Sequence, residues 1–236
     1  MGGTLPAPNL SAVLVAAGSS RRMGFDKILT PIAGEPLIRH AVRAFQICAA
    51  VREIVIVCAR EREAEVRAVL KDAGKVTTIV AGGASRQESV WNGLEALGAD
   101  AEFVAVHDAA RPLITPELIT RCFEAAVAHG AATAAEPVID TLQRADDLGN
   151  CAEVVEREGL WRMQTPQVFR LPDLRRAMEG VRASGASVTD ETSALRRMGG
   201  KVFLVENCDW NFKVTFPRDV AVAEFILQSR AATSFT

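Results

Sequence analysis

The stretch LVAAGSSRRMGFDK, residues 14–27, begins as a buried strand and then places glycine, serine, arginine and lysine residues in a short loop. Ligands of an open parallel sheet bind at the carboxyl ends of its strands, and this loop leaves a strand at such an end. Gly18 and Gly24 allow backbone N–H groups to turn toward a ligand. Arg21, Arg22 and Lys27 add donors that stay charged at pH 7. The loop therefore suits a polyphosphate.

The loop matches neither of two common phosphate-binding patterns. Lys27 lies three residues past Gly24 and is followed by Ile28, whereas a Walker A lysine is followed by serine or threonine. The G-x-G-x-x-G spacing of dinucleotide-binding loops is also missing. The alternative is a plain glycine turn with solvated arginines, and only other segments of the sequence can distinguish it from a phosphate-binding loop.

Short β-branched runs alternate with longer helical patterns, which predicts an α/β fold with a parallel sheet and crossover helices. The expected strands cover residues 12–15, 53–58, 77–80, 103–107, 133–137 and 202–205. The expected helices cover residues 35–47, 61–73, 85–97 and 115–129, with two more after the segment LWRMQTPQVF. Pro217 opens the last helix, and the tail from Gln228 reads as frayed. Without an internal repeat or a low-complexity linker, residues 1–236 are expected to form one domain.

The composition favours a soluble, cytoplasmic protein in which any anion-binding site is local. The 236 residues are 49% hydrophobic, and 27 basic against 29 acidic residues give a net charge of −2, so there is no global field for nucleic acid or an anionic membrane. No apolar run approaches the roughly 20 residues of a membrane-spanning helix. The five cysteines are scattered and form no C-x-x-C pair, which argues against a disulfide framework or a zinc site.

Two further segments carry polar residues at expected strand ends. In VAVHDAARPLI, residues 104–114, a buried run ends at His107 and Asp108, so the Asp108 carboxylate is a candidate to hold Mg²⁺ that bridges phosphates, and Arg111 could face the same anion. In GGASRQESVWNGL, residues 82–94, a Gly-Gly turn precedes a helix start whose N–H groups can meet an anion or a base edge. Each segment alone also reads as a structural turn or an ordinary cap.

A two-stranded arm is expected within PVIDTLQRADDLGNCAEVVEREG, residues 137–159. Residues 138–143 and 152–157 alternate partly in character and flank ADDLGN, which reads as a turn. Such a hairpin is marginal by itself in water, so a partner subunit is its natural support. The alternative is a solvent-exposed hairpin whose arginines do nothing.

These segments together resemble the 2-C-methyl-D-erythritol 4-phosphate cytidylyltransferases of the non-mevalonate isoprenoid pathway. The resemblance runs from about Ser11 to Leu227 and rests on AAGSSRRMG, GGASRQESVWNGL, VHDAARP, PVIDTLQR, LWRMQTPQVF, VTDETSAL and NFKVTFPRDVAVAEF. It implies a Rossmann-like nucleotidyltransferase fold, mostly parallel, and a homodimer that forms through an arm at residues 138–158. It also implies CTP with Mg²⁺, and transfer of CMP to a sugar-alcohol phosphate with release of pyrophosphate.

The resemblance also implies site residues, which are carried over by position. Implied catalytic residues are Lys27, Lys213 and Arg22. Implied CTP contacts are Ala16, Ala17, Gly18, Ser19, Ser20, Arg22, Lys27, Gly83, Ser89, Asp108 and Ala109. Implied contacts of the second substrate are Asp108, Arg111, Thr141, Arg157, Thr165, Thr189, Asp190 and Lys213, with Thr141 and Arg157 reaching the partner's site. Mg²⁺ is implied at Asp108 or on the CTP phosphates.

Two other families resemble parts of the chain. RMGFDKILTPIAGEPLI is similar to the molybdenum-cofactor nucleotidyltransferases, because Lys27 lies four positions after Met23 rather than the usual six. Gln143 also stands where the cytidylyltransferases usually carry lysine. However, HDAARP, TPQ and NFKVT in this arrangement point away from the molybdenum-cofactor enzymes. Ribitol-phosphate cytidylyltransferases look similar, so the acceptor stays open at this point.

Overall fold

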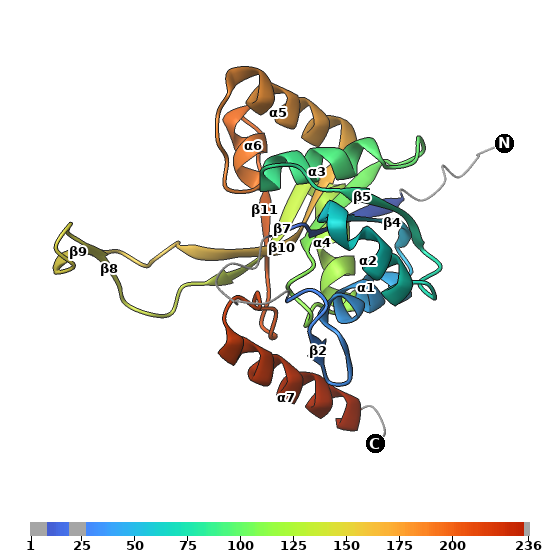
Figure 1. Cartoon of the computed structure of the whole chain (residues 1–236). Helices are drawn as coiled ribbons and strands as arrows, with labels where there is room; N and C mark the ends of the chain where they lie inside the picture. The colour runs from blue at the N-terminus through green and yellow to red at the C-terminus, as the bar shows by residue number, and fades with distance from the viewer. Residues whose placement is uncertain (1–8, 19–26, 234–236) are drawn as a thin grey trace.

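A seven-stranded sheet forms the centre of the protein, whose computed structural model describes residues 9–18 and 27–233 (Figure 1). In sheet order the strands are β11 (Phe203–Glu206), β7 (Ala131–Pro137), β10 (Trp161–Arg170), β6 (Phe103–Asp108), β1 (Leu10–Ala16), β4 (Val51–Cys58) and β5 (Val76–Ala81). β10 runs antiparallel to both of its neighbours, while β1 pairs in parallel with β4 and β6. The expected α/β fold with a mostly parallel sheet is confirmed.

Side chains of β1 alternate between two apolar layers, because successive residues of a strand point to opposite faces. Leu10, Ala12 and Leu14 pack in the layer that contains α1 (Leu37–Ile47) and α4 (Pro116–His129). Val13 packs in the opposite layer, which contains α3 (Arg86–Glu95), α5 (Leu171–Ser184) and α6 (Glu191–Arg197). The sheet is therefore buried on both faces, and its carboxyl edge is the place where polar side chains collect.

Helix boundaries follow local capping signals. Thr115 accepts a hydrogen bond from the Leu118 N–H at 3.3 Å and Pro116 occupies the first turn, as the sequence predicts for α4. The helix expected from residue 35 begins at Leu37, because Glu35–Pro36 forms a short strand, β3, that pairs with β2 (Pro31–Ile32). The helix expected over residues 61–73 is shorter: the 3-10 turn η1 (Arg60–Arg62) precedes α2 (Glu63–Val69).

Two parts of the chain differ from the expectation. LWRMQTPQVF forms most of β10, an antiparallel strand that its polar residues do not reveal. The tail expected to fray from Gln228 instead continues α7 (Pro217–Thr233). Ile226 is 8% exposed, and Arg230 Nη1 donates to the Leu113 carbonyl at 2.7 Å, so tertiary contacts hold this last part of the helix.

A two-stranded arm, β8 (Leu142–Ala145) and β9 (Cys151–Val155), projects from the sheet (Figure 1). Its turn is fixed by Asp146, whose Oδ1 accepts from the Leu148 and Asn150 N–H groups. The predicted hairpin and its turn are therefore confirmed, with strands shorter than residues 138–143 and 152–157. Apolar side chains of this region are exposed to solvent, namely Ile139, Leu148 and Val154.

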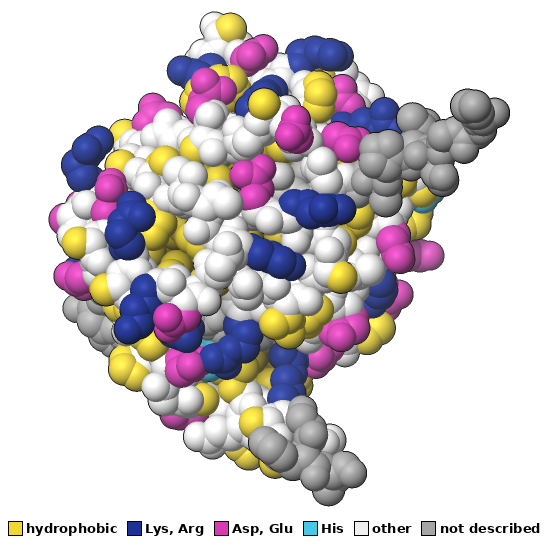
Figure 2. Space-filling view, turned by 90° about the vertical axis from the view of Figure 1, so that its right-hand side faces the viewer, with side chains coloured by type: hydrophobic (Ala, Val, Ile, Leu, Met, Phe, Trp, Pro, Cys, Tyr) yellow, Lys and Arg dark blue, Asp and Glu magenta, His cyan; other side chains and the backbone are white. Residues whose placement is uncertain are grey.

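Basic and acidic side chains are interspersed on the face turned toward the viewer in Figure 2, which lies at the right of Figure 1. This mixture agrees with a net charge of −2. Within residues 9–18 and 27–233, no helix is both long and apolar enough to cross a bilayer.

Candidate active site

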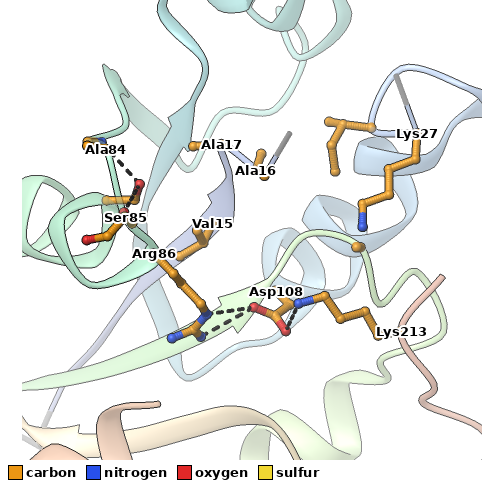
Figure 3. A pocket seen from close by; sticks show the side chains of 14 residues that line it. Val15, Ala16, Ala17, Lys27, Ala84, Ser85, Arg86, Asp108 and Lys213 are labelled. Carbon is orange, nitrogen blue, oxygen red and sulfur yellow. Dashed lines mark hydrogen bonds and ion pairs between the residues drawn. The ribbon is translucent and has the colours of Figure 1, made fainter. Parts of the chain in front are cut away.

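A cavity of about 330 Å³ opens at the carboxyl ends of β1, β5 and β6 (Figure 3). Segments that are distant in sequence line it. These lining residues are Val15, Ala16, Ala17, Gly18, Lys27, Ile28, Gly83, Ala84, Ser85, Arg86, Ser89, Asp108, Ala110 and Lys213. The cavity thus unites the opening loop with the other two segments that sequence analysis selected, at the edge where parallel sheets bind ligands.

The Gly-Gly turn packs closely against the opening loop and the start of α3. A Cβ at Gly82 would lie 2.4 Å from the Ala17 Cβ, and one at Gly83 would lie 2.3 Å from the Glu88 Cβ. Ser89 Oγ accepts from the Gly83 N–H at 3.1 Å and donates to the Ser85 carbonyl at 2.8 Å. The turn is therefore held in one conformation, with backbone rather than side chains facing the cavity.

Asp108 is the buried carboxylate of the cavity, and three cationic side chains surround it, of which Figure 3 shows Arg86 and Lys213. Its Oδ2 lies 2.8 Å from Lys213 Nζ and 3.9 Å from Arg111 Nε, while Oδ1 lies 3.3 Å from Arg86 Nη2. Burial opposes ionisation, but Arg86 and Lys213 outweigh it and hold the pKa of Asp108 below its ordinary range. Asp108 is therefore a carboxylate at neutral pH.

Lys27 lies across the cavity from Ser85 and Arg86, and its ammonium points toward the side where Asp108 and Lys213 lie (Figure 3). Its Nζ donates to the Val214 carbonyl at 3.2 Å. The segment that carries Lys213 is itself fixed, because the Val214 N–H donates to the Ala110 carbonyl at 2.8 Å. Cations from two ends of the sequence thus face one cavity.

His107 is fully buried and its hydrogen bonds fix its tautomer. Its Nε2 lies 3.3 Å from the Arg111 carbonyl, which can only accept, so Nε2 carries the proton. Its Nδ1 then accepts from Thr165 Oγ1 at 2.9 Å, and the same hydroxyl accepts from the Asp108 N–H at 3.1 Å. The Thr165 hydroxyl therefore donates its hydrogen to His107 and accepts from the Asp108 N–H, so Thr165 and His107 together position the backbone of Asp108.

Burial lowers the pKa of His107 from 6.5 to about 3, which predicts an acid-sensitive fold. Between these values the unfolded chain binds a proton that the folded chain does not, so stability is lost as the pH falls from 6.5 toward 3. We expect His107 to contribute a slope of about 1.4 kcal/mol per pH unit to the free energy of unfolding in this window.

Urea titrations between pH 4 and 7 measure this slope. His107→Gln should show a shallower dependence on pH than the wild type, whereas His129→Gln, an exposed control, should keep the wild-type slope. Equal slopes in the wild type and His107→Gln would contradict the assignment of a neutral, buried His107.

The other predicted residues that the structure describes do not line the cavity. Ala109 is buried beside it and its N–H donates to the Val15 carbonyl at 3.0 Å. Asp190 caps α6 and accepts from Gln167 Nε2 at 2.9 Å, with the exposed Thr189 beside it. Thr141 and Arg157 are exposed in the arm region. Predicted residues outside the described part of the chain are Ser19, Ser20, Arg21, Arg22 and Gly24.

Two charged residues, Arg86 in the cavity and its partner Glu191, were not predicted from the sequence. Arg86 lines the cavity, and its Nη1 lies 2.6 Å from Oε1 of Glu191, which is 1% exposed. The sequence did hold a signal for Arg86, because it directly follows the capping Ser85 and so begins the helix after β5. No local signal pointed to Glu191, because its partner is distant in the sequence.

The described residues do not fit a divalent cation that is held by protein ligands. Asp108 already faces three cations, and within residues 9–18 and 27–233 no group of three or more histidine, cysteine, aspartate or glutamate side chains could hold a metal. Hard divalent cations prefer several oxygen ligands. A protein-held metal at Asp108 is thus disfavoured, and the oxygens of a phosphate ligand would be better partners for such a cation.

The mostly parallel sheet with helices on both faces, together with the solved structures that it resembles, places the chain in the Rossmann-like nucleotidyltransferase fold class. A family profile described as 2-C-methyl-D-erythritol 4-phosphate cytidylyltransferase matches residues 10–229. The chain belongs to this family.

Individual members of this family are similar to the chain over nearly its whole length. Enzymes with this same name from Nitrosomonas eutropha and Symbiobacterium thermophilum are each 42% identical to the chain, over 94% and 97% of its length and 98% and 97% of theirs. The crystal structure of the Thermus thermophilus 2-C-methyl-D-erythritol 4-phosphate cytidylyltransferase is 32% identical and superposes with a TM-score of 0.78, covering 92% of this chain and 98% of that one. The comparisons do not favour the molybdenum-cofactor and ribitol-phosphate alternatives.

Proposed function

We propose that this chain transfers CMP from CTP to 2-C-methyl-D-erythritol 4-phosphate, giving 4-diphosphocytidyl-2-C-methyl-D-erythritol and pyrophosphate. Membership of the family supports the reaction. The observation that carries it is the cavity in which Lys27 and Lys213 converge beside glycine turns, with Arg86 paired to Asp108 and Glu191. Such an arrangement can neutralise a triphosphate and hold a base with backbone groups.

In the proposed mechanism the acceptor phosphate attacks the α-phosphorus of CTP in line, and pyrophosphate leaves. Lys27 and Arg22 neutralise the triphosphate, while Lys213 approaches the α-phosphate from the other side. A phosphate monoester has a second pKa of about 6, so the nucleophile is already ionised and needs no general base. Mg²⁺ belongs to this proposal as a partner of the CTP phosphates.

The acceptor is proposed to bind near Asp108 and Arg111. Arg111 is 12% exposed and its Nη1 donates to the Asn211 carbonyl at 2.7 Å, so its guanidinium is held in place before substrate arrives. Asp190, with Thr189 beside it, and Thr165 complete this side of the proposed site. Because the Thr165 hydroxyl donates to His107, it would meet the acceptor through its remaining lone pair.

A homodimer is part of the same proposal, and its support is the arm. A two-stranded hairpin is marginal alone in water, yet this one projects from the sheet with exposed Ile139, Leu148 and Val154 (Figure 1). We propose that residues 138–158 pack on a second copy within a cytoplasmic enzyme, and that Thr141 and Arg157 reach the acceptor in the partner's site. Residues 1–236 would then act as one cytidylyltransferase domain.

Pyrophosphate release tests the function. The wild type should release pyrophosphate from CTP when 2-C-methyl-D-erythritol 4-phosphate is present, and not in its absence. Ribitol 5-phosphate in a parallel assay checks the acceptor. Equal rates with both acceptors, or none with either, would contradict the proposal.

The base preference provides a separate prediction. The Gly83 N–H and the Ser89 hydroxyl hydrogen already donate to Ser89 Oγ and the Ser85 carbonyl, so the groups proposed to meet the cytosine amino group are the Gly83 carbonyl and the remaining lone pair of Ser89 Oγ. A purine that does not fit these acceptors would leave them unpaired. We expect kcat/KM for CTP to exceed that for GTP at least about a hundredfold in a competition assay. A preference for GTP would favour the molybdenum-cofactor alternative.

A further inference from the structure

The two oxygens of Asp108 contact different cations. Oδ1 accepts from both Nε and Nη2 of Arg86 at 3.3 Å, whereas Oδ2 accepts from Lys213 Nζ at 2.8 Å (Figure 3). The orientation of the carboxylate therefore depends on Arg86 at one oxygen and determines where the Lys213 ammonium lies at the other. Lys213 follows β11 in a segment without helix or strand, whose backbone is held by the bond from the Val214 N–H to the Ala110 carbonyl. The contact with Asp108 then fixes the position of the Lys213 ammonium at the end of its long side chain.

Arg86 is held at its far end by Glu191. Arg86 Nη1 donates to Glu191 Oε1 at 2.6 Å, so one planar guanidinium connects the end of β6 with the first residue of α6. Burial raises the pKa of Glu191 and Arg86 opposes that rise. Among the described residues, Glu191 Oε2 has no hydrogen-bond partner, and Glu191 is not one of those that line the cavity. Glu191 thus contacts the site through Arg86.

We propose that Glu191 and Arg86 are positioning residues for the transfer reaction: Glu191 fixes Arg86, Arg86 fixes the Asp108 carboxylate, and Asp108 places Lys213. This inference rests on the proposed function, because Lys213 is there assigned to the α-phosphate. Lysine cannot replace Arg86, because one ammonium on a flexible stem does not reproduce a rigid fork that engages two carboxylates. The pair therefore controls the position of a phosphate-binding ammonium while the cytosine side of the cavity stays unchanged.

The test compares R86K, E191Q and the double variant with the wild type. For each protein, kcat, both KM values, the Kd for CTP in a titration without acceptor, and the Tm are measured. The control is Arg43→Lys, which alters an exposed ion pair with Glu35 on another part of the fold. We expect kcat to fall about ten- to hundredfold in R86K and E191Q, since small displacements of a reacting group cost rate on this scale. The Kd for CTP should change less than about threefold, which is below a tenfold affinity step.

The double variant shows whether Glu191 and Arg86 affect kcat through one shared contact or independently of each other. Because Glu191 acts through Arg86, the double variant should match R86K within about twofold, rather than multiply the two losses. The proposal would be overturned if the fall in kcat of the double variant equalled the product of the two single falls. It would also be overturned if kcat stayed within about twofold of the wild type in both single variants. A lowered Tm with an unchanged kcat per folded site would also overturn it, since the pair would then be structural. A wild type that forms no product from CTP and the acceptor would instead contradict the proposed function.

Discussion

Lys27→Ala is expected to lower the rate of pyrophosphate release at saturating CTP about a hundredfold or more. Loss of one preorganised donor that stabilises charge in a transition state typically costs about 3 kcal/mol, and Lys27 faces the cavity that Asp108 and Lys213 line. Folding should tolerate the change. In the described chain it removes a partly buried hydrogen bond to the Val214 carbonyl, which contributes about 1 kcal/mol.

Two further variants make the Lys27 result interpretable. Lys27→Met keeps most of the aliphatic stem, so a similar loss in this variant assigns the effect to charge rather than packing. Lys71→Ala, an exposed lysine after α2, serves as the control and should keep wild-type turnover. Near-wild-type turnover by Lys27→Ala, measured together with an unchanged Tm, would show that the opening loop does not serve the phosphates.

A mixture of Lys27→Ala and Arg157→Ala subunits is expected to recover about a quarter of wild-type activity, although each variant alone is inactive. If arms are exchanged about a two-fold axis, each mixed dimer has one site with both defects and one intact site. Random exchange puts about half of the dimers in this class. The observations behind this prediction are that Arg157 is exposed and that the arm projects from the sheet that bears the cavity (Figure 1).

The complementation experiment needs a control on the same arm. Arg144→Ala removes an exposed ion pair with Glu153, at 3.1 Å, and should leave activity unchanged both alone and in mixtures. Subunit exchange is followed independently, by mass spectrometry of differently tagged subunits. Complete exchange without recovery would mean that Arg157 serves its own subunit or no site, and the arm would have no role in the partner's site.

The sequence by itself determined the fold class and most of the sheet. Apolar, β-branched runs are typical of strands buried on both faces of a parallel sheet, so β1, β4 and β6 could be predicted from their composition. The edge strand β5 is mostly half-buried, and its β-branched residues alone indicated it. β10 could not, because Gln164, Thr165 and Gln167 are buried polar residues whose hydrogen bonds come from other segments. The helical end of α7 was missed for a similar reason, since hydrogen bonds from Arg230 to the Leu113 carbonyl and to Asp209 stabilise it.

For the candidate site, the sequence located glycine turns and charged residues at strand ends, and the cavity unites several of them. It could not reveal which charges pair. Arg86 and Glu191 are separated by 105 positions, and Asp108 and Lys213 by the same number, so only the folded chain brings them within hydrogen-bonding distance. Local sequence sets strands, turns and caps, because these depend on neighbouring residues. The electrostatics of a buried carboxylate depend on which segments converge around it, and the tertiary structure alone decided that for Asp108.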